Sequence, residues 1–243
     1  MGNTPSISIP TETPETIEYP ELEEFSKWEK ELGFNNFFFS ELTSQLKYSS
    51  FYDIGGIIPE NNFESLIQKV FGYNENKIMF LFKNNKFYTE KNLGINLDKI
   101  ILTLFLFTQN KIVQSSDGFV SDKAYFLFAK VTKDKNGIIS RSEIDEFVKS
   151  LLDIAVNQII QNFIKWKENH NEQVNSLYNE IIEKNFNFIE QMIMNSFPVD
   201  EDSFSFQDIN ERFTSMQNFL TIDFFLNGFM KNIKGITPTT TGK

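Results

Sequence analysis

A run of twelve mostly polar residues between two amphipathic segments constrains the fold of this chain more than any other stretch. The run Thr132–Glu143 carries oxygen-bearing side chains at several alternate positions and a glycine at its sixth position. The apolar residues at helical spacing are Tyr125, Phe128, Ala129 and Val131 before the run, and Ile144, Phe147, Val148, Leu151 and Leu152 after it. This pattern predicts a helix, a polar loop and a second helix.

The loop has the spacing of an EF-hand calcium loop, which uses oxygen ligands at positions 1, 3, 5, 7, 9 and 12 and a glycine at position 6. The candidate ligands are Thr132, Asp134, Asn136, Ile138, Ser140 and Glu143. Ile138 can offer only its backbone carbonyl, whereas Glu143 has the reach to grip the ion with both carboxylate oxygens. The sequence therefore predicts a Ca²⁺ site in this loop.

The first position departs from the pattern, because Thr132 stands where an aspartate is expected. The loop then holds two formal negative charges, on Asp134 and Glu143. Since the number of charged ligands helps to set calcium affinity, we expect a weak site. A structural hairpin that has lost its ion is the alternative interpretation.

Two earlier segments repeat the helix-loop-helix pattern without ligands at the required spacing. In the first, Ile57–Ile58 reads as a short strand before a helix over Phe63–Phe71. In the second, Ile95–Leu97 precedes a helix over Ile100–Thr108. A β-hairpin around Asn84 is the alternative for the start of the second segment, since periodicity alone does not separate the two.

A fourth unit follows the predicted calcium loop. Placing Phe204 at position 8, the position of Ile139 in the third loop, puts Phe197 at position 1, where its side chain cannot bind an ion. Asp208 falls at position 12 but is shorter than the usual glutamate. We interpret this unit as a non-binding partner of the third, with the acidic run 200–202 as a poorer candidate site.

The expected fold class is all-α, with two pairs of EF-hand helix-loop-helix units and short inter-loop strands. A lone unit leaves its apolar face uncovered, so the units should pack in pairs. The expected divisions are a flexible tail at 1–19, a degenerate pair at 20–112, a pair with the calcium loop 132–143 at 113–234, and a disordered tail at 235–243.

The amino-acid composition excludes several classes of function. The chain of 243 residues has a formal net charge of −10, so it lacks the basic surface that nucleic acid requires. The absence of cysteine excludes thiolate catalysis and a cysteine zinc site, and His170 is the single histidine, set among polar neighbours. No apolar run approaches the length of a bilayer span, and the start does not read as a secretory signal. We expect a cytoplasmic protein that is not an enzyme.

The N-terminus matches the N-myristoylation pattern, with Gly2 as the acceptor and Ser6 at the required distance. One myristoyl chain binds a membrane only marginally. The glutamates between positions 12 and 24 would be repelled by an anionic leaflet. Any peripheral membrane association through this group is therefore expected to be reversible.

These features together resemble the myristoylated EF-hand proteins, including the calcineurin B-like and neuronal calcium sensor proteins. A closer resemblance is to the N-terminal EF-hand region of the myristoylated TLDc-domain proteins, the mTOR-associated group and its plant relatives. The resemblance extends over roughly residues 20–234 and rests on Asn136–Glu143 and Ser205–Ile209, which stand in matching order. The TLDc domain itself is not expected here, so roles carried by that domain are not implied.

The expected function is that of a calcium-binding sensor or adaptor. Calcium would reorient the helices beside the loop and alter a helical surface that meets a protein target of unknown identity. A calcium-independent helical scaffold with degenerate EF-hands is the alternative.

Overall fold

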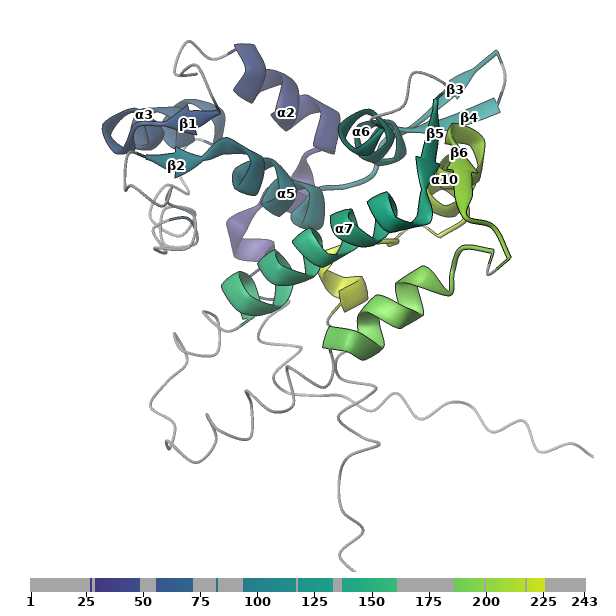
Figure 1. The fold of residues 1–243 in the computed structure, drawn as a ribbon. Helices are drawn as coiled ribbons and strands as arrows, with labels where there is room; N and C mark the ends of the chain where they lie inside the picture. Colours follow the sequence, from purple (N-terminus) through teal and green to yellow (C-terminus); the bar gives the residue numbers. More distant parts are fainter. Residues whose placement is uncertain are drawn as a thin grey trace, which may run out of the picture.

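The computed structural model describes residues 27, 29–48, 56–71, 82, 94–116, 118–132, 137–160, 186–198, 200–216 and 218–225. Within these ranges the chain is mostly helical, which confirms the predicted helical class with short strands (Figure 1). The named helices are η1 (Phe34–Asn36), α2 (Phe39–Tyr48), α3 (Glu60–Phe71), α5 (Leu97–Phe107), α6 (Asp122–Val131), α7 (Arg141–Leu152), η4 (Asp153–Ile160) and α10 (Phe206–Ser215). The strands are β1 (Ile57–Ile58), β2 (Ile95–Asn96), β3 (Ile112–Ser115), β4 (Gly118–Ser121), β5 (Ile138–Ser140) and β6 (Ser203–Ser205).

Helix α5 lies at the centre of the core. Nearly all of its residues are buried, as expected for a helix that is apolar all round. The ring of Phe105 lies 5.3 Å from that of Phe39 on α2, 5.6 Å from Phe147 on α7 and 6.0 Å from Phe213 on α10. Buried residues from both predicted halves of the chain thus belong to one hydrophobic cluster around this helix.

Two of the three antiparallel strand pairs join the loops of the predicted helix-loop-helix units. In the first, Ile58 of β1 lies opposite Ile95 of β2. Gly94 lies so close to β1 that an added Cβ would be 2.4 Å from the carbonyl oxygen of Ile58. The backbones can therefore approach only because this residue is glycine. The second pair, β5 with β6, belongs to the candidate site below.

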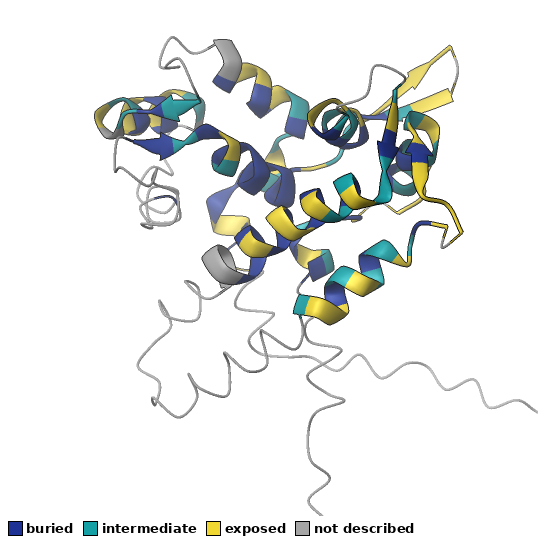
Figure 2. Ribbon diagram, viewed as in Figure 1, coloured by how far each residue is buried: buried dark blue, intermediate teal, exposed yellow. Residues whose placement is uncertain are grey.

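The hairpin β3–β4 was not predicted. It stands at the edge of the molecule beside α10, and most of its residues are exposed (Figures 1 and 2). Ser115 lies opposite Gly118, and the Ser115 hydroxyl donates to the Gly118 carbonyl at 3.0 Å. The strands carry no long run of alternating apolar residues, so period-two patterning was too weak to reveal them.

The apolar stretch after Gly33 is divided between η1 and α2. At the break, the Gln109 N–H donates to the Phe37 carbonyl at 3.0 Å, and the Phe39 N–H donates to the Gln109 carbonyl at 3.1 Å. Gly33, with φ 74°, ends the preceding helical residues. The tertiary bridge to Gln109 competes with the helical bonds and resets the start of α2.

The buried face of α6 differs from the predicted one. Tyr125 is 66% exposed and Ala129 is also exposed, whereas Lys123, Ala124 and Leu127 are buried. The reason is a tertiary contact: the Lys123 ammonium donates to carbonyls at the end of α5 and lies 5.1 Å from the centre of the Phe105 ring. Two residues of the predicted pattern do pack inward, since Val131 is buried and Phe128 lies against the core. By contrast, the predicted apolar face of α7 is buried throughout.

Helix α7 continues into η4, in agreement with the predicted extension through the residues after Leu152, although η4 has π-helical winding. Several expectations lie outside the described residues. They include Gly2, both predicted tails, the loop 83–92 with its alternative hairpin, and most of the segment between η4 and residue 186.

Candidate metal loop and its paired partner

The candidate loop begins at the C-terminal end of α6. Thr132 caps that helix and is half-buried. Its N–H donates to the Phe128 carbonyl at 2.9 Å, and its hydroxyl donates to the same oxygen at 2.6 Å. The hydroxyl proton is thus directed to the helix end, and a lone pair of the oxygen stays available as a ligand.

The middle of the loop is described only from Gly137 onward. Asp134 and Asn136, the predicted ligands at positions 3 and 5, lie outside the described residues. Gly137 has φ 67°, in the left-handed region that favours glycine, which agrees with the sharp turn expected at position 6. The described part of the loop therefore has the predicted turn.

A strand pair joins the third loop to the fourth. Ile139 lies opposite Phe204, and both side chains are fully buried. The flanking pairs are Ile138 with Ser205 and Ser140 with Ser203. This is the register that results when Ile139 and Phe204 are placed at the same loop position. Figure 1 shows β5 and β6 side by side, leading into α7 and α10 respectively.

The end of the third loop forms a capping box on α7. The Glu143 Oε2 accepts from the Ser140 N–H and from the Ser140 hydroxyl, each at 2.9 Å. In return, the Glu143 N–H approaches the Ser140 hydroxyl oxygen at 3.3 Å. The carboxylate is held at the positive end of the helix, where its charge is favourable. Two predicted ligands, at positions 9 and 12, are thus in direct contact.

The fourth loop also ends with a capping box, at the start of α10. The Asp208 Oδ2 accepts from the Ser205 N–H and the Ser205 hydroxyl, each at 2.7 Å. Ser205 and Asp208 stand in the register of Ser140 and Glu143, three residues apart at the start of α10. The two loops therefore share a strand pair and a helix cap, whatever else differs between them.

An arginine of the third unit holds the fourth loop. The Arg141 N–H donates to the Asp202 carbonyl at 2.8 Å. Its guanidinium donates to the carbonyls of Met194 at 3.2 Å and Glu201 at 3.1 Å, and also to that of Pro198. The same group lies 5.3 Å from the centre of the buried Phe204 ring. A planar guanidinium offers several donors in a fixed arrangement, so it can satisfy the carbonyls of a loop that has no ion.

Phe197 occupies the first position of the fourth loop. It is 1% exposed, and its ring lies 5.2 Å from that of Phe204 and 6.1 Å from that of Phe219. An apolar ring thus fills the place where a calcium loop needs an oxygen. Asp200 and Asp202, the poorer candidates, are exposed. This geometry agrees with a fourth loop held by protein contacts.

A second group of ionisable side chains lies away from the loops. Burial lowers the pKa of Lys123 to about 7, and burial followed by the Asp223 charge raises the pKa of Glu29 to about 8. Burial also raises the pKa of Asp223. Glu29 and Asp223 line a cavity of about 310 Å³ beside the end of α5. The acids hydrogen-bond to each other, so the group is satisfied internally and needs no ligand.

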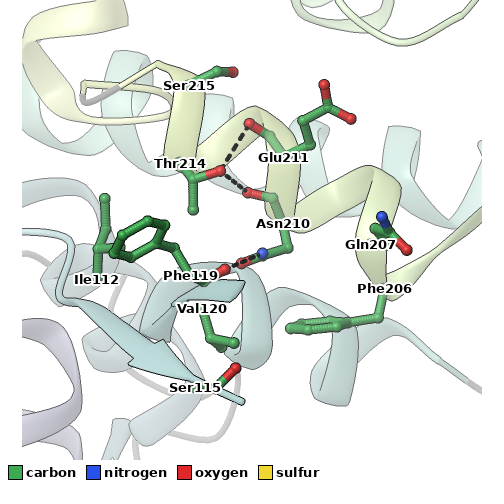
Figure 3. A pocket seen from close by; sticks show the side chains of 10 residues that line it. All are labelled: Ile112, Ser115, Phe119, Val120, Phe206, Gln207, Asn210, Glu211, Thr214 and Ser215. Atoms are coloured by element: carbon green, nitrogen blue, oxygen red, sulfur yellow. Dashed lines mark hydrogen bonds between the residues drawn. The ribbon is translucent and has the colours of Figure 1, made fainter. Parts of the chain in front are cut away.

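The largest of the described cavities lies between the β3–β4 hairpin and α10, with a volume of about 780 Å³ (Figure 3). Ile112, Phe119 and Phe206 give it an apolar wall, and Glu211 supplies its charged side chain. Figure 3 shows Asn210 of α10 directed at the carbonyl of Phe119. The cavity is open and mixed in character, unlike an enclosed ligand site.

Sequence reasoning named the loop residues but missed the roles of Arg141, Lys123 and Asn210. Arg141 follows Ser140 within the motif that carries the family resemblance, yet its three carbonyl partners lie 53 to 60 residues further along the chain. No local pattern reveals contacts at that separation. Within the described part of the chain, no group of three or more acidic or histidine side chains is arranged to hold a metal ion, and Asp134 is outside that part.

Comparison with family models, with curated proteins and with solved structures gave no match for this chain.

Proposed function

We infer that this protein binds Ca²⁺ through its third loop and acts as a calcium-responsive sensor or adaptor. The proposed ligands are Thr132, Asp134, Asn136, Ile138, Ser140 and Glu143. The observation that carries the proposal is the pairing of Ile139 with Phe204, in the register expected when two such loops meet. The turn at Gly137 and the position of Glu143 at the start of α7 are consistent with it.

Calcium binding at the proposed site would change the position of helix α7. Binding through both oxygens of Glu143 would compete with the capping bonds from Ser140, because both use the same carboxylate. The start of α7 would then shift relative to the loop, and α7 contacts the core through Phe147. A change at one end of the helix would thereby alter the surface presented to a protein target. No catalytic role is proposed.

Calorimetric titration with Ca²⁺ tests the proposal. The wild-type chain should bind one ion, and Glu143→Gln should weaken binding about tenfold or more, because one charged bidentate ligand is lost. Asp208→Asn is the matched control, since it makes the same kind of change in the equivalent capping box of the fourth loop. It should leave binding unchanged. A folded wild-type chain without binding heat, or equal losses in both variants, would contradict the proposal.

A calcium-independent scaffold is the second candidate, and the contacts of Arg141 favour it. If protein groups can hold the fourth loop without an ion, the third loop can also serve only to pair with it. Thermal unfolding in excess Ca²⁺ and in chelator separates the two functions. A sensor gains stability with the free ion concentration, whereas a scaffold gives the same melting temperature in both conditions.

Reversible membrane association through an acyl group on Gly2 is a further part of the proposal, carried by the N-terminal pattern alone. None of the helices within the described ranges is long and apolar enough to cross a bilayer. Intact mass after co-expression with an N-myristoyltransferase tests the modification, with Gly2→Ala as the control. An unmodified wild-type chain would remove this part of the proposal without affecting calcium binding.

A further inference from the structure

The hairpin β3–β4 has one edge that is covered and one that is open. On the outer side of β4, the Asn210 side chain accepts from the Ser121 N–H at 2.8 Å and donates to the Phe119 carbonyl at 2.7 Å. Asn210 thus takes the place of a third strand (Figure 3). On the outer side of β3, Ile112 and Gln114 are exposed, and no backbone hydrogen-bond partner for either is found among the described residues.

The contacts of Asn210 also show which groups of β3 face the open edge. In an antiparallel pair, residues alternate between pairs that bond each other and pairs whose backbone groups point away. Phe119 and Ser121 direct backbone groups outward to Asn210, so they belong to the second kind. Their partners in the register are Gln114 and Ile112. The N–H and C=O of these two residues therefore point away from β4, towards solvent.

The open edge lacks the features that usually keep edge strands from pairing. Strand β3 reads Ile112-Val113-Gln114-Ser115 and contains no charge and no proline. Ile112 is 41% exposed and Val113 is 50% exposed, so apolar side chains accompany the free backbone groups. Figure 2 shows the hairpin as an exposed projection from a buried body. An isolated two-stranded sheet of this kind gains stability from a further strand.

We propose that β3 pairs antiparallel with β3 of a second copy of this chain, about a two-fold axis at Val113. In this register, Ile112 lies opposite Gln114 of the partner subunit, and their outward groups form four backbone hydrogen bonds across the axis. The two Val113 side chains meet at the axis, where a pair of β-branched residues is favourable. The result is a four-stranded sheet, closed at both outer edges by Asn210.

The lack of charge on β3 makes this strand a suitable contact between two copies of an acidic chain. The chain carries a net charge of −10, so two copies repel each other over most of their surfaces. Strand β3 is uncharged, and it presents the same donors and acceptors when reversed, as a two-fold interface requires. A charged peptide would find no opposite charge on this strand. The hairpin is thus a place where two copies can meet without bringing like charges together.

Sedimentation equilibrium of the full chain over a range of concentrations tests the proposal. The wild-type chain should show a monomer–dimer equilibrium. Val113→Lys and Val113→Asp should each weaken the dimer about tenfold or more, because like charges then meet at the axis. An equal mixture of the two variants should recover dimer, since the opposite charges face each other. Circular dichroism should show both variants folded, because the Val113 side chain is half exposed.

Three outcomes overturn the proposal: a wild-type chain that stays monomeric, a dimer that neither charge affects, and a mixture that associates no better than its components. A second pair of variants tests the backbone contact itself. Gln114→Pro removes an outward N–H without touching the bonds to β4, and should abolish the dimer. Gln114→Thr keeps the N–H and should retain the dimer. Equal effects of the two would show that β3 does not pair through its edge.

Discussion

The third and fourth loops have the same frame, meaning a short strand followed by a capped helix, but they differ in the side chain at the first position. Each ends in a short strand and a capped helix, with Ser140 and Glu143 in one and Ser205 and Asp208 in the other. At the first position, however, the third loop has the half-buried hydroxyl of Thr132, and the fourth has a ring that is 1% exposed. The strand pair and the helix caps are therefore common to both loops, whereas the side chains at the first position differ in size and polarity.

The difference follows from how each loop satisfies its backbone carbonyls. The fourth loop directs carbonyls to the guanidinium of Arg141, which comes from the third unit. A bound cation could serve the same purpose in the third loop, since carbonyl and carboxylate oxygens are the ligands that Ca²⁺ prefers. Arg141 of the third unit thus supplies a permanent cation to the fourth loop.

The largest expected effect comes from truncating the residues at the first positions of the two loops to alanine. Phe197→Ala should cost about 3–5 kcal/mol of unfolding free energy, because it opens a cavity against two buried rings. Thr132→Ala removes one hydrogen bond at a half-buried site and should cost about 0.5–1.5 kcal/mol. Urea unfolding measures both. Equal losses would contradict the view that only the fourth loop is packed by its first residue.

The second-largest expected effect is a loosening of the fourth loop when the guanidinium of Arg141 is removed. Arg141→Ala leaves several carbonyls without a donor and should cost about 2 kcal/mol. Arg141→Lys should recover little, because an ammonium lacks the planar array of donors. Hydrogen exchange should become faster across residues 195–202 in both variants. Lys130→Ala, which removes a cation of α6 that pairs with Asp98 at the surface, is the control and should leave that exchange unchanged.

Placing an aspartate at the first position should have different effects in the two loops. Thr132→Asp adds a charged ligand at position 1 and should tighten Ca²⁺ binding about tenfold, or about 1.4 kcal/mol. Phe197→Asp, the same change in the fourth loop, should create no site and should destabilise the fold, because it buries a carboxylate in an apolar cluster. Calorimetry on both variants provides the comparison. Unchanged affinity in Thr132→Asp would favour the scaffold.

The smallest expected effect comes from removing the helix caps that the two loops have in common. Ser140→Ala and Ser205→Ala each remove a helix cap and should each cost about 1 kcal/mol. The losses should be similar in the absence of Ca²⁺, since both boxes have the same contacts. Thermal unfolding in chelator measures them. A loss confined to one variant would show that the two frames are not equivalent.

Local patterns predicted much of this arrangement. The register of Ile139 with Phe204 followed from counting loop positions, and the buried face of α7 followed from its apolar spacing. The apolar spacing of α6 was less informative, because Tyr125 is exposed whereas Lys123 is buried. Its ammonium finds two carbonyls on α5, a contact that outweighs the preference of lysine for water.

The sequence by itself determined the positions of most helices, the buried face of α7 and the turn at Gly137. These properties depend on residues within one or two turns of one another, so spacing alone expresses them. The tertiary structure decided the inward turn of Lys123, the grip of Arg141 on the fourth loop and the open edge of β3. Each of these depends on groups far apart in the chain, whose meeting is set by how the whole core packs.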